Sequence, residues 1–393
     1  MRRHRIVAIA VFIFFQAAAV MAYEFNPGIS LSLSEEYNDN IFLGHSDRKS
    51  DFITYVSPGA YLSLRSAGGS EFRVDYSPSF NYYASQSGQN NTSHNASARG
   101  SFILSEKTNL RISDAFVLSK ELRDLRTLTD FGPIRSRTEV RVNTLRGDIS
   151  HKLGGHFSLL LGGSYIDTEF KDPGFNAFKA YSGTAGLGYR INERSNVSAN
   201  AGYAKYDYNL SNDADIQDYT LALTHRITPT LTLGVTGGAA LTKIEHAGKW
   251  SANFSGGIEL RQQIERGSAV LSLRQLVEPG LEEGRPLRTL MAGLRLTGSL
   301  TELWTVSLSS SYNTYKSINT PDTDVDMVIL SAELTYNIRR WAGLALSYSY
   351  VDYNDRRSRT GDYYDNRAAL TLRVHYDKRQ MQTQSDQERL SGP

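Results

Sequence analysis

The chain has 393 residues, contains no cysteine, and carries 43 basic against 41 acidic residues, a formal net charge of +2 at pH 7. This balance argues against a protein that coats a polyanion, so we expect no nucleic-acid partner. We find no composition shift or linker beyond the N-terminal segment, which indicates one large domain rather than several small ones.

The N-terminal segment, residues 1–22, has the pattern of a signal peptide. Met1–Arg5 is basic, and Ile6–Val20 is apolar apart from Gln16. Val20 and Ala22 then supply small residues at positions −3 and −1. The apolar run is shorter than the roughly 20 residues of a membrane-spanning helix. We therefore predict cleavage after Ala22 and export of the mature chain.

From residue 23 onward, apolar and polar residues alternate. Trp250, Phe254 and Ile258 share one parity, whereas Ser251 and Glu259 share the other. A period of two is typical of a β-strand with one apolar and one polar face. We find no sustained helical period after residue 22, so we predict an all-β fold.

Short and long connections alternate strictly along the chain. The short ones lie at 66–69, 105–107, 152–154, 191–194, 227–229, 263–266, 299–300 and 339–341. The longer ones lie near 40–50, 85–90, 119–137, 170–175, 209–215, 245–247, 279–283, 316–323 and 355–362. This segmentation predicts about 18 antiparallel strands over residues 23–377, in the up-and-down order of a transmembrane β-barrel, with both termini on the periplasmic side. Closure is required because unpaired backbone groups at a sheet edge are costly in hydrocarbon.

Tyrosines gather where the strands approach the longer connections. They are Tyr82, Tyr83, Tyr203, Tyr206, Tyr208, Tyr312, Tyr315, Tyr348, Tyr350, Tyr353, Tyr363 and Tyr364. We interpret them as an aromatic girdle at the outer membrane interface. This location, an outer membrane, implies lipid, lipopolysaccharide and the barrel-assembly machinery as partners.

If the apolar parity faces lipid, a set of charged residues faces an aqueous lumen. These candidates for lumen lining and selectivity are Glu71, Arg73, Asp75, Glu259, Arg274, Arg295, Glu333 and Arg373. Charges on the wall of a pore can sense the charge of a passing solute. The alternative, that they only pair with one another across strands, stays open.

The longest connection, residues 119–137, is rich in basic residues. Its candidates for a constriction folded into the lumen are Lys120, Arg123, Arg126, Arg135 and Arg137. Guanidinium groups in such a constriction would favour carboxylate or phosphate groups. A solvated outer loop that contacts lipopolysaccharide phosphates is the equal alternative.

Two prolines fall inside predicted strands. Pro58 and Pro78 come out almost opposite each other when the chain is folded back about the turn near Gly68. Proline lacks the N–H that a strand ladder needs. We therefore expect one shared β-bulge to absorb both defects and to bend the wall.

The N-terminal part of the mature chain also resembles a known family. Ser32–Leu43, the triplets at 57–59 and 76–78, and the pair Tyr82-Tyr83 are similar to the β-barrel porin type-2 family. The resemblance covers residues 28–85. It implies an outer-membrane outlet that exports an exopolysaccharide together with a periplasmic polysaccharide-export protein. A general diffusion porin for small solutes and a plugged structural or surface-recognition barrel remain alternatives.

The last predicted strand resembles the terminal assembly signal of such barrels. Its outward parity is formed by Leu370, Leu372, Val374 and Tyr376. Residues 378–393 continue past it as a polar tail that we expect in the periplasm. The chain shows no phosphate loop, metal-ligand spacing or catalytic triad that we can identify. We therefore predict no enzyme activity, no cofactor and no metal site.

Overall fold

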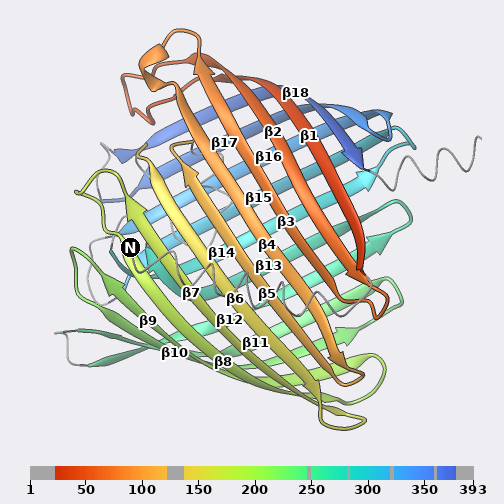
Figure 1. Cartoon of the computed structure of the whole chain (residues 1–393). Coiled ribbons are helices and arrows are strands. Elements are labelled where there is room, and N and C mark those ends of the chain that lie inside the picture. The colour runs from red at the N-terminus through yellow and green to blue at the C-terminus, as the bar shows by residue number, and fades with distance from the viewer. Residues whose placement is uncertain are drawn as a thin grey trace, which may run out of the picture.

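Eighteen antiparallel strands form one closed sheet in the computed structural model (Figure 1). The structure describes residues 23–121, 137–245, 249–280, 284–318, 323–357 and 361–377. The predicted signal peptide at 1–22 and the predicted tail at 378–393 lie outside them. The strands are β1 Tyr23–Asn38, β2 Asp51–Ser66, β3 Glu71–Tyr83, β4 Asn91–Ser105, β5 Thr108–Ser119, β6 Val140–Lys152, β7 Phe157–Phe170, β8 Phe178–Arg190, β9 Ser195–Tyr208, β10 Ala214–Arg226, β11 Leu231–Ile244, β12 Trp250–Ile264, β13 Gly267–Gly280, β14 Arg285–Ser299, β15 Trp304–Ser317, β16 Asp324–Arg339, β17 Ala342–Asp355 and β18 Tyr363–Asp377.

Each strand pairs with its sequence neighbours, and the first strand pairs with the last. β1 is hydrogen-bonded to β2 on one side and to β18 on the other, with Leu33 opposite Leu372. A sheet closed in this way has no edge, so its backbone groups are satisfied without water. The predicted up-and-down barrel is therefore confirmed. Among the described residues, no helix has the length and apolarity needed to span a membrane.

The alternation of short and long connections is confirmed except at β13–β14, where the connection holds four residues and is no longer than the longest of the short ones. The connections β2–β3, β4–β5 and their counterparts each hold two to four residues, and the chain from Tyr23 to Asp377 begins and ends at that same end of the barrel. The opposite end carries the longer connections, of which 120–139 is the longest. We call these the turn end and the loop end.

The outward face of the barrel is apolar. Leu221, Phe254 and Leu271 are 69%, 55% and 56% exposed, far more than a large apolar residue in a soluble core. Leu370, Leu372 and Tyr376 of the predicted assembly signal also lie on this face. A largely apolar exterior on a closed barrel is the surface that meets lipid.

The predicted tyrosine girdle divides into two sets. The strand register and the alternation of side chains show which face each tyrosine is on. The members on the outer face are Tyr82, Tyr203, Tyr312, Tyr348, Tyr350 and Tyr364. The members on the inner face are Tyr83, Tyr206, Tyr208, Tyr315, Tyr353 and Tyr363. Tyr82 is 51% exposed whereas its neighbour Tyr83 is 4% exposed. Successive residues of a strand point to opposite faces, so adjacent tyrosines cannot share one girdle. The girdle prediction is correct for the outward set and wrong for the inward one.

The two prolines lie directly opposite each other, but they make no bulge. Val56 pairs with Phe80 and Ala60 with Tyr76, so the register of β2 and β3 is unchanged across the gap. Hydrogen-bonded rungs occur at Ser66/Ser70 and at Phe52/Ala84, and they recur every second residue. Pro58 and Pro78 therefore occupy one such rung, where both missing N–H groups fall together. The bulge prediction is wrong. The two prolines remove one pair of ladder hydrogen bonds, and neither strand holds an extra residue at that position.

Candidate functional site

All eight predicted lumen residues face the inside of the barrel. On β3, Val74 and Tyr76 of the other parity are exposed on the lipid face, which places Glu71, Arg73 and Asp75 inside. The same register argument places Glu259 on β12, Arg274 on β13, Arg295 on β14, Glu333 on β16 and Arg373 on β18 inside. The apolar-outward assignment therefore gives the correct face for every member.

Most of these charges are paired. Arg73 binds Asp75 at 2.6 Å, and Arg373 reaches past β17 to Glu333 at 2.8 Å. Glu71 pairs with Arg65 at 3.1 Å and Glu259 with Arg261 at 3.1 Å. In the described part of the chain, Arg274 and Arg295 have neither an ion pair nor a side-chain hydrogen bond. Of the eight predicted residues, they are therefore the cations most available to a passing anion.

The lumen is basic from mid-strand to the turn end. Within the described residues, twelve basic side chains face this part of it, against six acidic ones. The basic residues are Arg65, Arg73, Arg99, Arg111, Arg146, Lys152, Arg190, Arg226, Arg261, Arg274, Arg295 and Arg373, and the acidic residues are Glu24, Glu71, Asp75, Asp148, Glu259 and Glu333. The potential of this wall therefore favours anions.

The loop end of the lumen is packed with apolar side chains. Three buried clusters occupy the inward face there: Leu43, Leu287, Tyr315, Val325, Met327, Val351, Tyr353 and Tyr363; Val140, Val142, Phe178, Ala180, Tyr208 and Ala214; and Ile41, Ile53, Tyr55 and Tyr83. Each member is at most 8% exposed. Leu43 and Ile41 of the β1–β2 connection belong to two of these clusters, so this connection packs against the inner wall and narrows the loop end. The narrowing was not predicted from the sequence, although its signal is there: Val140 and Val142, or Val325 and Met327, are apolar residues at positions of the polar parity.

Beside the third cluster, a buried ion pair joins the two ends of the longest connection. Arg137 donates to Glu121 at 2.8 Å, and their side chains are 6% and 5% exposed. Tyr83 on β3 donates to Glu121 at 2.7 Å, and Asn91 on β4 donates to it at 2.6 Å. Arg137 also donates to the carbonyl of Ile41 at 3.3 Å and stacks over the Tyr83 ring at 4.6 Å. Both ends of the connection are thus bound to the inner wall.

Of the predicted constriction residues, only Lys120 and Arg137 lie among the described residues. Lys120 donates to Gln89 at 2.8 Å in the β3–β4 connection. Arg123, Arg126 and Arg135 lie outside the described residues, so the inward fold of the connection stays a prediction for them.

Burial has a measurable effect on the Arg137 guanidinium. Removal from water, reinforced by the charge of Arg367 and opposed by Tyr55 and Glu36, lowers the pKa of Arg137 to about 10. That value is well above neutral pH. Arg137 therefore stays cationic and keeps its ion pair under physiological conditions.

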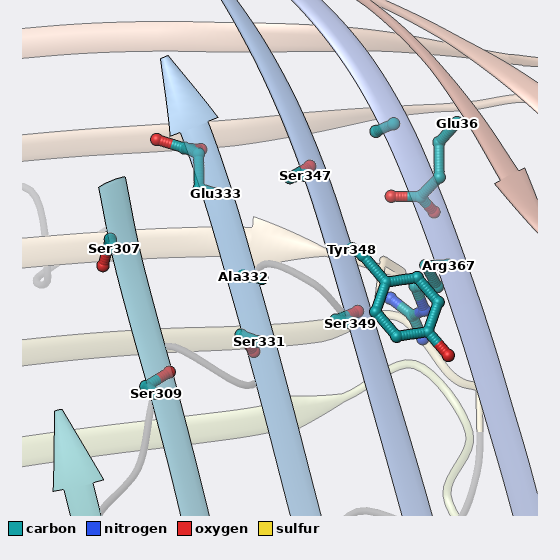
Figure 2. A pocket seen from close by; sticks show the side chains of 11 residues that line it. Glu36, Ser307, Ser309, Ser331, Ala332, Glu333, Ser347, Tyr348, Ser349 and Arg367 are labelled. Atoms are coloured by element: carbon teal, nitrogen blue, oxygen red, sulfur yellow. The ribbon is translucent and has the colours of Figure 1, made fainter. Parts of the chain in front are cut away.

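A recess in the inner wall is lined by residues of β1 and β15–β18 (Figure 2). We call it the serine recess. It has a volume of about 230 Å³, and its hydroxyl groups come from Ser307, Ser309, Ser331, Ser347 and Ser349 on β15–β17. Glu36, Glu333 and Arg367 also line it. The sequence analysis named only Glu333 among these residues.

Known proteins share this fold at low sequence identity. OccAB4 of Acinetobacter baumannii has a TM-score of 0.50 and 10% identity, covering 91% of this chain and 99% of its own. The structure of OpdK of Pseudomonas aeruginosa with vanillate has a TM-score of 0.50 and 10% identity, covering 90% and 99%. A further OpdK structure, described as an outer membrane protein, has a TM-score of 0.49 and 11% identity, covering 89% and 99%. No family model and no curated protein matches the chain.

The closed barrel, its apolar exterior and this shared fold place the chain in the outer membrane as a β-barrel. The predicted resemblance is supported at the level of this fold. The comparisons give no support to the link with exopolysaccharide export.

Proposed function

We propose that the chain is an outer-membrane channel for small hydrophilic solutes, with its turn end in the periplasm and its loop end outside. The observation that carries this proposal is a charged, hydroxyl-rich lumen that leads to a constricted loop end. Short turns on the periplasmic side are the usual arrangement in bacterial barrels. The fold is shared with OpdK, whose structure with vanillate involves a small solute.

A narrow loop end disfavours our first prediction, an exopolysaccharide outlet. A polymer needs a continuous wide passage, whereas the inward clusters leave their members at most 8% exposed. The comparisons likewise favour a porin over an exporter and a channel over an enzyme. We therefore propose no periplasmic polysaccharide-export protein as a partner.

A plugged structural or surface-recognition barrel is the second candidate. The same packed loop end favours it, because a lumen closed throughout would conduct nothing. Under either function, we infer that the chain uses the β18 outward residues for recognition by the assembly machinery. We also infer that outer-leaflet lipopolysaccharide surrounds the loop end.

The separating experiment is reconstitution of the refolded protein in planar bilayers and in liposomes. We expect steady single-channel currents, and swelling with small sugars and amino acids but not with oligosaccharides. Silence in the bilayer together with no swelling would instead support the plugged barrel. Swelling with long oligosaccharides would return the polymer outlet to consideration.

A further inference from the structure

We propose that the serine recess is a docking site for a small, neutral, polyhydroxylated solute of about the size of one hexose ring. The proposal rests on the proposed function, because the solute must enter the lumen to reach the site. It adds a chemical class of substrate that neither the fold nor the comparisons specify.

The strand register sets the serines in two rows across the wall. Ser309, Ser331 and Ser349 are directly opposite one another on β15, β16 and β17. Ser307 and Ser347 flank Glu333 in the next row. Neighbours in a row have Cβ atoms roughly 4.5–5.5 Å apart. The result is a grid of hydroxyl groups at a spacing that one sugar ring can bridge (Figure 2).

The hydroxyl groups of this grid are free to bind. In the described part of the chain, none of the five serine side chains makes a hydrogen bond to protein, in contrast to Ser57 and Ser79, which bond each other at 2.8 Å. A hydroxyl both donates and accepts. A polyol can therefore replace the bound water at each serine with matching donors and acceptors.

The charged residues of the recess are largely compensated. Arg367 pairs with Asp365 at 2.7 Å, and Glu333 pairs with Arg373 at 2.8 Å. Glu36 accepts a hydrogen bond from Tyr55 at 3.3 Å. An ion thus finds little unpaired charge here. The carboxylate oxygens of Glu36 and Glu333 remain suitable acceptors for sugar hydroxyls, which favours a neutral polyol over an anion.

The position of the recess suits a solute waiting to pass the constriction. Ser349 is followed on its face by Val351, and Ser331 is preceded on its face by Ile329, both in or against the first apolar cluster. Its volume of about 230 Å³ is smaller than the roughly 300–1,000 Å³ of pockets for drug-sized ligands. A volume of this size matches a single sugar ring.

The test uses the full-length mature protein and glucose as the probe. The variant is the triple substitution Ser309→Ala, Ser331→Ala and Ser349→Ala, which removes one row of hydroxyls and adds no bulk. Its matched control is the triple substitution Ser101→Ala, Ser113→Ala and Ser150→Ala, on inward faces of β4–β6 outside the recess. Binding of glucose to detergent-solubilised protein is measured by calorimetry, and block of the ion current by glucose is measured in bilayers.

We expect saturable glucose binding and current block, an apparent affinity at least about tenfold weaker in the recess variant, and no change in the control. Conductance without glucose binding would overturn the docking site and leave the channel standing. Serine-dependent glucose binding without any conductance would overturn the channel and support the site. Equal weakening in both triple variants would also overturn the proposal, because it would show a general effect of luminal hydroxyls.

Discussion

At the residue scale, the Arg137–Glu121 pair ties both ends of the longest connection to the inner wall. Its side chains come from the two ends of one connection, and both are buried against β3 and β4. Arg137→Ala leaves Glu121 buried without its cation, which costs about 3 kcal/mol or more. We expect the Glu121 carboxylate to avoid this cost by turning toward water, away from the inner wall.

We therefore expect Arg137→Ala to raise single-channel conductance roughly twofold, since a wider constriction passes more current. Lys120→Ala is the matched control, because its hydrogen bond to Gln89 lies outside the buried network. An unchanged conductance in Arg137→Ala would show that the pair does not hold the constriction.

Asp39 forms a second charged contact at the loop end, where β1 meets β18. Burial raises the pKa of this carboxyl, but hydrogen bonds from the backbone and side chain of Asn366, together with Arg48, outweigh it and hold the pKa below its ordinary value of 3.8. A carboxyl with a lowered folded pKa stabilises the fold above its unfolded pKa, and this stability is lost as pH falls through the folded pKa.

We expect Asp39→Asn to reduce the free energy of unfolding by about 1–2 kcal/mol at neutral pH, through the loss of charge-assisted hydrogen bonds. Once the pH has fallen below the folded pKa of Asp39, the variant and the wild type should converge, because both then carry a neutral group. Urea unfolding in lipid vesicles at the two pH values measures this. A difference that persists in acid would contradict the electrostatic origin.

At the element scale, the empty rung between β2 and β3 is a local weakness in the wall. Both N–H groups are missing at Pro58 and Pro78, and the neighbouring serines Ser57 and Ser79 bridge the strands through their side chains instead. Pro58→Val and Pro78→Val each return one ladder hydrogen bond, worth about 1 kcal/mol, and keep an apolar group on the lipid face.

We expect each single substitution to stabilise the barrel by about that amount and the double substitution by about twice as much. The urea midpoint and hydrogen exchange at the β2–β3 pair are the measurements. A double variant no more stable than the wild type would mean that water or lipid already satisfies the two carbonyl groups.

The elements themselves were predictable from the sequence, whereas the contents of the lumen were not. Period-two alternation predicted eighteen strands and the inward face of Arg274 and Arg295, because parity depends only on local backbone geometry. It did not predict that Tyr83 and Tyr353 would be buried inside. Their burial depends on contacts between strands distant in sequence and on inward loop residues such as Ile41, which no local period encodes. The unpaired serines of the recess were missed for the same reason.

For the whole molecule, the excess of basic side chains toward the turn end sets the ionic preference of the pore. We expect anions to permeate better than cations at low salt, and the preference to shrink near 1 M salt, where the screening length falls to about 3 Å.

Arg274→Glu with Arg295→Glu reverses two cations that have no partner in the described structure, so the anion-to-cation permeability ratio should fall roughly twofold or more. Lys171→Glu with Lys249→Glu makes the same change of net charge on exposed connections at the loop end and should leave the ratio nearly unchanged. Reversal potentials across a salt gradient give the ratio directly. If both double variants shift the ratio equally, the selectivity depends on overall charge and not specifically on the luminal wall.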